Sequence, residues 1–232
     1  MKKTIGIIGG MGPLATADLY AKIVRCTDAA TDSEHIHVLI DSNTAVPDRT
    51  AAILGTGPSP VPELLRSAKR LETAGADFLI IPCNTVHYFY DALTGQTKLP
   101  VLHMLRLTAQ EIKRRGIGRV ALLATDGTVK TGIYARLFDE YNIAYLLPDE
   151  AGQRTVMDVI YAGVKANRRD YDTTALRKTL DGLMEQGAEA FVLGCTELPI
   201  AFEQYGLDYP VVDPTEVLAK AAIVEAGYRM AE

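Results

Sequence analysis

Residues 75–85 read GADFLIIPCNT, and residues 187–197 read GAEAFVLGCTE. In each stretch a glycine, an alanine and an acidic residue precede an apolar run, and a cysteine falls eight residues after the glycine. Unbroken apolar runs of this length between helices are typical of buried strands in a parallel sheet. Because the pattern occurs twice, about 112 residues apart, it predicts two related α/β units rather than a solenoid of short repeats.

The rest of the chain alternates expected strands with expected helices. The expected strands are residues 4–9, 35–41, 77–82, 99–104, 119–125, 143–148, 190–194 and 209–213. The predicted fold class is α/β, with two pseudo-symmetric domains, each a roughly four-stranded parallel sheet flanked by helices. We predict a first domain of residues 1–104 plus 211–232 and a second of residues 105–210. Open parallel sheets bind ligands at the carboxyl ends of their strands, so we expect an active site in the cleft between the domains.

Composition excludes several classes of function. The 232 residues are 48% hydrophobic and carry a net charge of −5 with acids and bases interspersed, so a nucleic-acid-binding surface is not expected. The chain has neither an apolar run of membrane-spanning length nor a signal peptide, which predicts a soluble cytoplasmic protein without a membrane partner. Three cysteines without a secretion signal favour reduced thiols, and four histidines in no ligand pattern predict no metal site.

The glycine turn after the first strand raises the question of a nucleotide. Residues 10–15 read GMGPLA, which has the G-x-G-x-x-A outline of a dinucleotide-binding loop. That fold places an acidic residue about 20 residues beyond the glycines, whereas here the second strand ends at Asp41, about 30 residues on. The second unit keeps one glycine of the turn, in residues 124–127 (ATDG). The alternative is that backbone N–H groups at this helix start hold a small anion such as a carboxylate.

Two of the three cysteines are candidates for catalysis. Cys83 and Cys195 each follow a strand at matching places of the repeat, whereas Cys26 has no counterpart and is expected to fill space in a helix. Two opposed thiols suit the inversion of a tetrahedral carbon, since one removes a proton from one face and the other returns a proton to the opposite face. One must begin as thiolate, although only about 3% of an ordinary thiol is ionised at pH 7. The polar neighbours expected around the ligand, some of which also cap helices, are Asn84, Thr85 and Thr196.

Six segments together resemble a known family. They are residues 5–16 (IGIIGGMGPLAT), 46–50 (VPDRT), 81–87 (IPCNTVH), 122–125 (LLAT), 163–166 (GVKA) and 194–197 (GCTE). In this order along nearly the whole chain, they resemble the aspartate racemases of the aspartate/glutamate racemase superfamily. The resemblance implies a cofactor-independent enzyme, commonly dimeric, with two cysteines as acid and base.

The resemblance also implies roles for individual residues. Cys83 and Cys195 would be the catalytic pair, with Asn84, Thr85 and Thr196 holding the α-amino and α-carboxylate groups. Arg49 and Lys165 would meet carboxylates of the substrate, and Met11 and Thr125 would line the pocket. From the residues alone, Arg49 is also consistent with a solvated loop residue, and Lys165 with a residue near a helix end that interacts with the helix dipole.

Two departures separate this chain from the glutamate racemase branch. That branch has histidine where this chain has Glu197, and an Asp-Ser pair where this chain has Gly10 and Met11. Both differences favour the aspartate-type branch. Some members of that branch, including ones of broad specificity, lack the first cysteine, whereas this chain has both.

The predicted function is the interconversion of L- and D-aspartate by a homodimer without cofactor or metal. Activity on glutamate is left open. One alternative is an enzyme like maleate isomerase, which also uses paired cysteines and acts on a small dicarboxylate. The other is a non-catalytic protein that binds acidic amino acids, for which an acid/base pair would have no purpose.

Overall fold

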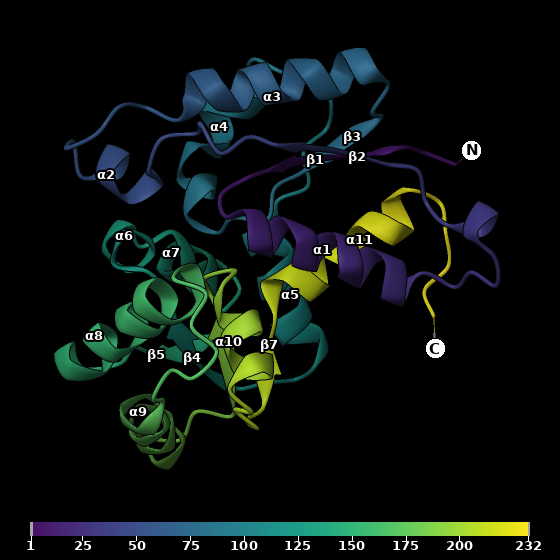
Figure 1. The fold of residues 1–232 in the computed structure, drawn as a ribbon. Coiled ribbons are helices and arrows are strands. Elements are labelled where there is room, and N and C mark those ends of the chain that lie inside the picture. The colour runs from purple at the N-terminus through teal and green to yellow at the C-terminus, as the bar shows by residue number, and fades with distance from the viewer. Residues whose placement is uncertain (1, 232) are drawn as a thin grey trace. The chain divides into compact units, whose positions relative to one another are not determined.

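The structure is a computed structural model that describes residues 2–231 (Figure 1). The chain divides into two compact units, one formed by residues up to Met104 together with those from Thr215 onward, the other by Leu105–Pro214. Each unit is an α/β structure built on its own parallel sheet. Within residues 2–231, no helix is long and apolar enough to cross a membrane.

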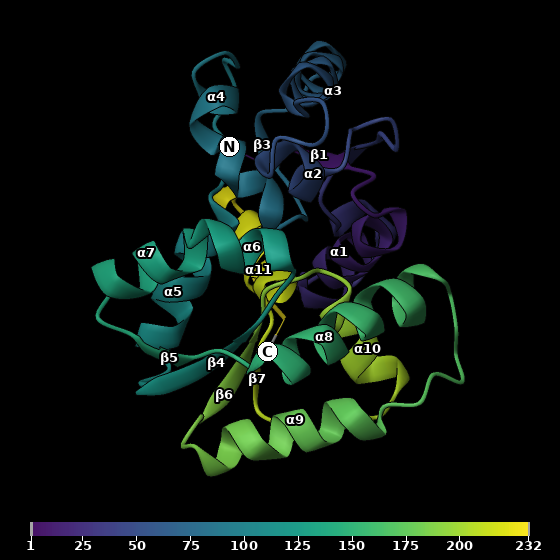
Figure 2. The same ribbon diagram turned by 90° about the vertical axis from the view of Figure 1, so that its left-hand side faces the viewer.

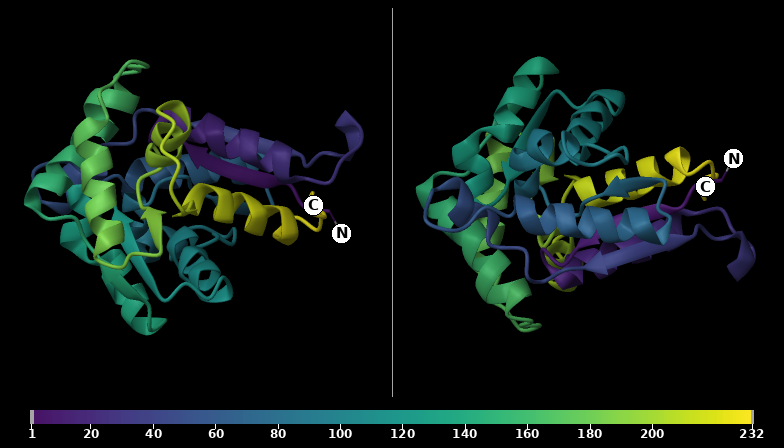
Figure 3. Two further views of the ribbon diagram at one scale, coloured as in Figure 1. Left: turned by 90° about the horizontal axis from the view of Figure 1, so that it is seen from below. Right: turned by 90° about the horizontal axis from the view of Figure 1, so that it is seen from above.

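The first unit has a three-stranded sheet in the order β2-β1-β3. The strands are β1 (Ile5–Gly9), β2 (Val38–Ser42) and β3 (Phe78–Ile80), all parallel, with Ile5 of β1 opposite Val38 and Phe78. Helix α3 (Val61–Ala74) covers one face of this sheet, and α1 (Pro13–Cys26) and α11 (Pro214–Glu225) cover the other (Figures 1 and 3). Four shorter helices complete this unit: η1 (Asp32–Glu34) precedes β2, and α2 (Arg49–Ile53), η2 (Thr85–Phe89) and α4 (Tyr90–Thr94) come after β2 or β3.

The fourth strand predicted for this sheet, residues 99–104, is reduced to a single parallel bridge between Val101 and Leu79. The amide of Leu79 donates to the Pro100 carbonyl and that of Leu102 donates to the Leu79 carbonyl. Pro100 has no N–H to donate, and helix α5 (Met104–Arg114) already begins at the last residue of this segment. The ladder is therefore too short to count as a strand.

The second unit has a four-stranded parallel sheet in the order β5-β4-β6-β7. The strands are β4 (Arg119–Leu123), β5 (Ala144–Leu146), β6 (Ala190–Leu193) and β7 (Val211–Val212). The helices are α5, α6 (Asp126–Thr131), α7 (Ile133–Glu140), α8 (Glu150–Asp158), the π-helix η3 (Val159–Lys165), α9 (Thr174–Glu185) and α10 (Leu198–Gln204). In Figure 2, α5 and α7 lie on one face of this sheet, and α8, α9 and α10 lie on the other.

The second compact unit ends at Pro214, four residues beyond the domain boundary predicted at residue 210. Val211 and Val212 pair with Phe191 and Val192 of β6, so residues 211–214 belong with the second unit rather than with the first. Backbone pairing therefore decides where β7 belongs. The strand order β2-β1-β3 of the first unit matches β5-β4-β6 of the second, as the internal repeat predicts.

Candidate active site

The glycine turn after β1 is held by a threonine of the same unit. Gly10 has a φ of +89°, and a Cβ on it would lie 2.4 Å from the carbonyl carbon of Asn43, so only glycine fits. The Gly10 amide donates to Thr16 Oγ1 at 2.9 Å, and that hydroxyl donates to the Gly12 carbonyl at 2.9 Å. Gly10 thus has a structural reason to be glycine, and its amide is used inside the protein rather than offered to an anion.

Arg49 and Met11 meet at the carboxyl end of β1. Asp48 caps α2 by accepting from the amide of Ala51 at 2.8 Å, which sets the direction of the helix that Arg49 begins. Arg49 Nη1 donates to the Pro47 carbonyl at 3.1 Å, and Nη2 donates to the carbonyl of the buried Met11 at 3.4 Å. The guanidinium is therefore half-buried and held by loop carbonyls, rather than solvated as a surface loop residue would be.

Cys83 follows β3 at the same edge of the sheet. It is buried in one apolar cluster with Met11 and Val46, and its amide donates to the Ile81 carbonyl at 2.9 Å. Asn84 and Thr85, also buried, open helix η2, and α2 packs against η2. Because β1 and β3 are parallel neighbours, the structure gathers the five predicted residues of the first unit at one edge of its sheet.

His87 is a residue of this site that the sequence did not single out for catalysis. Its side chain is buried, with Nδ1 2.9 Å from the Cys83 carbonyl oxygen and Nε2 3.2 Å from the amide of Met104. Burial, together with the neighbouring His103, lowers the pKa of His87 to about 3. In the sequence His87 lies four residues after Cys83, at the end of the segment 81–87, and that spacing alone assigned it no role. Among residues 2–231, no three His, Cys, Asp or Glu side chains are grouped as metal ligands would be.

In the second unit, three consecutive buried residues follow β6: Cys195, Thr196 and Glu197. Cys195 Sγ donates to Glu197 Oε2 at 3.0 Å, and the hydroxyl of Thr196 donates to the same oxygen at 3.5 Å. Thr125 follows the parallel neighbour β4 and caps α6, where its hydroxyl lies 3.2 Å from that of Thr128. Thr125 and the Cys195 segment thus share one edge of this sheet.

Lys165 reaches the same group from a different element. It ends the π-helix η3, which packs against α10, the helix that begins directly after Glu197. Lys165 Nζ lies 3.7 Å from Glu197 Oε1 and 4.5 Å from the centre of the Tyr161 ring, and its side chain is 30% exposed. A π-turn widens the helix, and such turns occur often at functional sites. Thiol, carboxylate and ammonium therefore form one chain of contacts.

The surroundings of Cys195 favour the protonated form of its thiol. Burial raises the pKa of Cys195 well above its ordinary value, and the charge of Glu197 raises it further, while Lys165 opposes both. Transfer of the thiol proton to Glu197 leaves the total charge of the buried pair unchanged. The pair can consequently supply a thiolate without adding a second buried negative charge. The sequence had used Glu197 only to tell two branches of a family apart.

A family model described as Asp/Glu/Hydantoin racemase matches residues 8–222. The chain belongs to this family. It is 36% identical to an aspartate racemase from Picrophilus torridus, covering 99% of this chain and 96% of the other with a TM-score of 0.85.

Two further relatives show how the family varies. An aspartate racemase homologue from Pyrococcus horikoshii is 26% identical, covers 98% of this chain and all of its own, and has a TM-score of 0.77. A broad specificity amino-acid racemase from Bacillus subtilis is 27% identical over 94% of this chain and 96% of its own length. Membership of the racemase family alone therefore does not select the amino acid.

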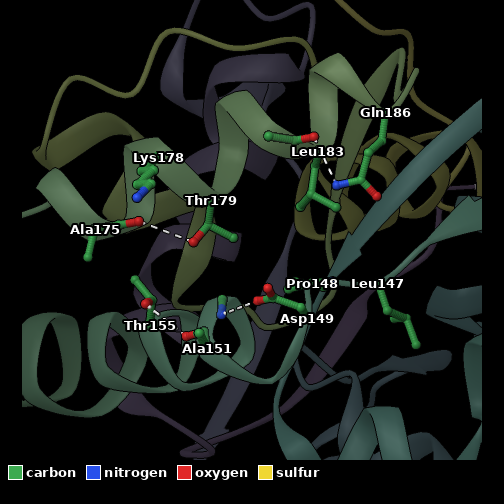
Figure 4. Close-up of a pocket in the computed structure, with 12 residues that line it drawn as sticks. Leu147, Pro148, Asp149, Ala151, Thr155, Ala175, Lys178, Thr179, Leu183 and Gln186 are labelled. Carbon is green, nitrogen blue, oxygen red and sulfur yellow. Dashed lines mark hydrogen bonds between the residues drawn. The ribbon is translucent and has the colours of Figure 1, made fainter.

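A groove of about 470 Å³ in the second unit lies apart from the predicted residues of this racemase-family chain (Figure 4). It runs between α8 and α9, and no residue predicted for the active site lines it. Three of its polar side chains make local hydrogen bonds: the hydroxyls of Thr155 and Thr179 donate to carbonyls of their own helices, and Asp149 caps α8. We do not assign the racemase site to this groove.

Proposed function

We propose that the protein is a cofactor-independent racemase that interconverts L- and D-aspartate, with Cys83 and Cys195 as the two proton-transfer groups. The observation that carries the proposal is the hydrogen bond from the Cys195 thiol to the buried carboxylate of Glu197, with Lys165 beside it. A cysteine that only filled the core would have no need of a buried proton acceptor. The similarity to an aspartate racemase over nearly the whole chain supports the choice of substrate.

The proposed reaction is a pair of proton transfers. In one direction, Glu197 takes the thiol proton of Cys195, and the resulting thiolate removes the α-proton of the substrate. The Cys83 thiol gives its proton to the opposite face of the carbanion and becomes a thiolate. Exchange with water then returns a proton to Cys83 and removes one from Glu197. In the other direction, which starts with the Cys83 thiolate and a protonated Glu197, the Cys83 thiolate removes the α-proton and the Cys195 thiol supplies the new one. Glu197 then returns its proton to the Cys195 thiolate.

The remaining predicted residues would bind the substrate. Arg49 and Lys165 would hold its carboxylates, in exchange for part of the contacts that they make in the structure, with loop carbonyls at Arg49 and with the Glu197 carboxylate at Lys165. Asn84, Thr85 and Thr196 would hold the α-amino and α-carboxylate groups, with Met11 and Thr125 lining the pocket. Aspartate, with two carboxylates, suits two cationic groups better than a monocarboxylic amino acid does.

Proton exchange in D₂O tests the proposal. Incubation with L-aspartate should replace the α-proton by deuterium and produce D-aspartate, as followed by NMR and chiral chromatography. A maleate-isomerase-like enzyme would leave the α-proton in place and interconvert maleate and fumarate. A binding protein would do neither. Either result would reject the proposed racemase.

Single-cysteine variants test the roles of the thiols. Cys83→Ala and Cys195→Ala should each abolish racemisation while still exchanging the α-proton of one enantiomer, because the surviving thiolate can return a deuteron to its own face. Cys26→Ala is the matched control: Cys26 ends α1 and should be dispensable. Racemisation at near wild-type rate by either of the first two variants would exclude the two-thiol mechanism.

A further inference from the structure

The contacts of His87 allow only one protonation state. A carbonyl oxygen accepts hydrogen bonds, so Nδ1 must carry the proton that it donates to the Cys83 carbonyl at 2.9 Å. A backbone amide donates, so Nε2 must offer a lone pair to the Met104 N–H at 3.2 Å. A protonated imidazole would turn a second N–H against the Met104 amide. The geometry therefore requires the neutral Nδ1–H tautomer.

The surroundings of His87 support the same state. The side chain is buried, and its ring stacks on that of Tyr90, with the His103 ring tilted at 5.0 Å. Tyr90 is itself anchored, since its hydroxyl donates to the Val101 carbonyl at 2.7 Å. Burial and the neighbouring His103 lower the pKa of His87 to about 3, against the opposing effect of hydrogen bonds to the backbone at Cys83, Asn84 and Leu102. The ring is thus fixed in position and neutral near pH 7.

The two backbone groups held by His87 lie far apart in the sequence. Cys83 is the proposed proton-transfer residue of the first unit, and Met104 is the residue at which the chain leaves that unit and enters α5. The ring therefore fixes the Cys83 peptide against a second segment of the same unit. Fixing the Cys83 carbonyl also fixes the neighbouring backbone torsion, and with it the direction of the Cα–Cβ bond that carries the thiol.

We propose that His87 is a positioning residue for Cys83, in which the neutral imidazole fixes the Cys83 peptide by bridging it to the Met104 amide. The inference rests on the proposed function and assigns His87 no proton transfer of its own. Misplacement of a reacting group by about 1 Å can cost about 100-fold in rate. Loss of the bridge should therefore slow proton transfer by Cys83 and leave transfer by Cys195 unchanged.

Two substitutions separate the halves of the bridge. The side-chain nitrogen of asparagine can occupy the place of Nδ1, so His87→Asn keeps a donor for the Cys83 carbonyl. The amide of glutamine reaches the place of Nε2, so His87→Gln keeps an acceptor for Met104 and loses the contact with Cys83. His37→Gln is a matched control, because His37 is an exposed histidine of the same unit.

Each substitution is combined with Cys195→Ala, where Cys83 alone exchanges the α-proton, and with Cys83→Ala, where Cys195 alone does so. We expect His87→Gln to lower the Cys83-dependent exchange of aspartate by about 10- to 100-fold, and His87→Asn to stay within about threefold of its parent. Neither should change the Cys195-dependent exchange. Equal losses in both backgrounds would show a general folding defect and overturn the inference, as would an unchanged Cys83-dependent rate in His87→Gln.

The exchange rates of the two single-cysteine parents, Cys195→Ala and Cys83→Ala, distinguish a failure of this inference from a failure of the proposed function. If neither single-cysteine parent exchanges either enantiomer, the two-thiol racemase is wrong and the positioning role falls with it. If the parents do exchange the α-proton but His87→Gln and His87→Asn show the same Cys83-dependent rate, the positioning role alone is rejected. Nitrogen-15 NMR of the wild-type imidazoles gives a readout without substrate: His87 should show the neutral Nδ1–H tautomer from pH 5 to 8. The opposite tautomer, or titration near pH 6.5, would refute the proposed bridge.

Discussion

Replacing Glu197 by glutamine should sharply reduce racemisation. The substitution keeps the size of the side chain but removes the carboxylate that accepts the Cys195 thiol proton at 3.0 Å. A positioned general base typically contributes about 100- to 10,000-fold to a rate. We therefore expect kcat/KM for aspartate to fall by at least about 100-fold.

An opposing effect must be weighed against this loss. Removing the charge of Glu197 lowers the pKa of Cys195 and so favours its thiolate. Burial, however, is the largest cause of the raised pKa, and it remains in the variant. The thiol therefore stays mostly protonated near pH 7, now without a base to take its proton, and the loss of the base dominates. The rate of the variant should rise with pH more steeply than that of the wild type, because hydroxide or water must remove the proton.

The assay is the initial rate of D-aspartate formation from L-aspartate, measured by chiral chromatography from pH 6 to 10. Glu197→Asp should recover part of the rate because it keeps a carboxylate, and Glu203→Gln, an exposed position on α10, should be unaffected. Combined with Cys83→Ala, Glu197→Gln should suppress the exchange that Cys195 performs. An unchanged or higher rate in Glu197→Gln would show that Glu197 only restrains the thiolate and does not accept its proton.

Arg49→Lys and Lys165→Ala should each lower kcat/KM for aspartate by about 10- to 100-fold, because a charge-assisted hydrogen bond to a bound carboxylate contributes about 1.5–3 kcal/mol. Alanine should remain a poor substrate of the wild type, and mutants with normal aspartate turnover would disprove the carboxylate clamp. The wild type should lose up to about 3 kcal/mol of unfolding free energy through His87 between pH 6.5 and 4, since its pKa of about 3 lies below the ordinary 6.5 and the unfolded chain binds the extra proton. Urea titrations should show a smaller acid loss in His87→Asn; an equal loss would contradict the buried neutral imidazole. Activity should survive EDTA and gel filtration, and recovery only on addition of metal, nucleotide or pyridoxal phosphate would overturn the cofactor-independent mechanism.

Local patterns were sufficient for much of the architecture. An apolar run between turn residues indicates a buried strand. For this reason the sequence could predict the two α/β units, their parallel sheets and the position of Cys83 and Cys195 directly after strands. The same patterns could not decide the strand count or the exact boundary. Residues 99–104 and Val211–Val212 both look like strands, but only backbone pairing with β3 or β6 determines how far each one extends and to which unit it belongs.

The candidate site divides in the same way. The sequence by itself predicted the two cysteines as candidates and, through a family resemblance, Arg49 and Lys165, because these predictions depend on residue type and order. Only the tertiary structure brought Lys165, on a π-helix some 30 residues earlier in the chain, to Glu197, and tied His87 to the amide of Met104. Such contacts depend on how separate elements pack and on which groups lose water. The spacing of residues along the chain contains no information about packing or about loss of water. The acidity of Cys195 and the tautomer of His87 could therefore be assigned only from the folded structure.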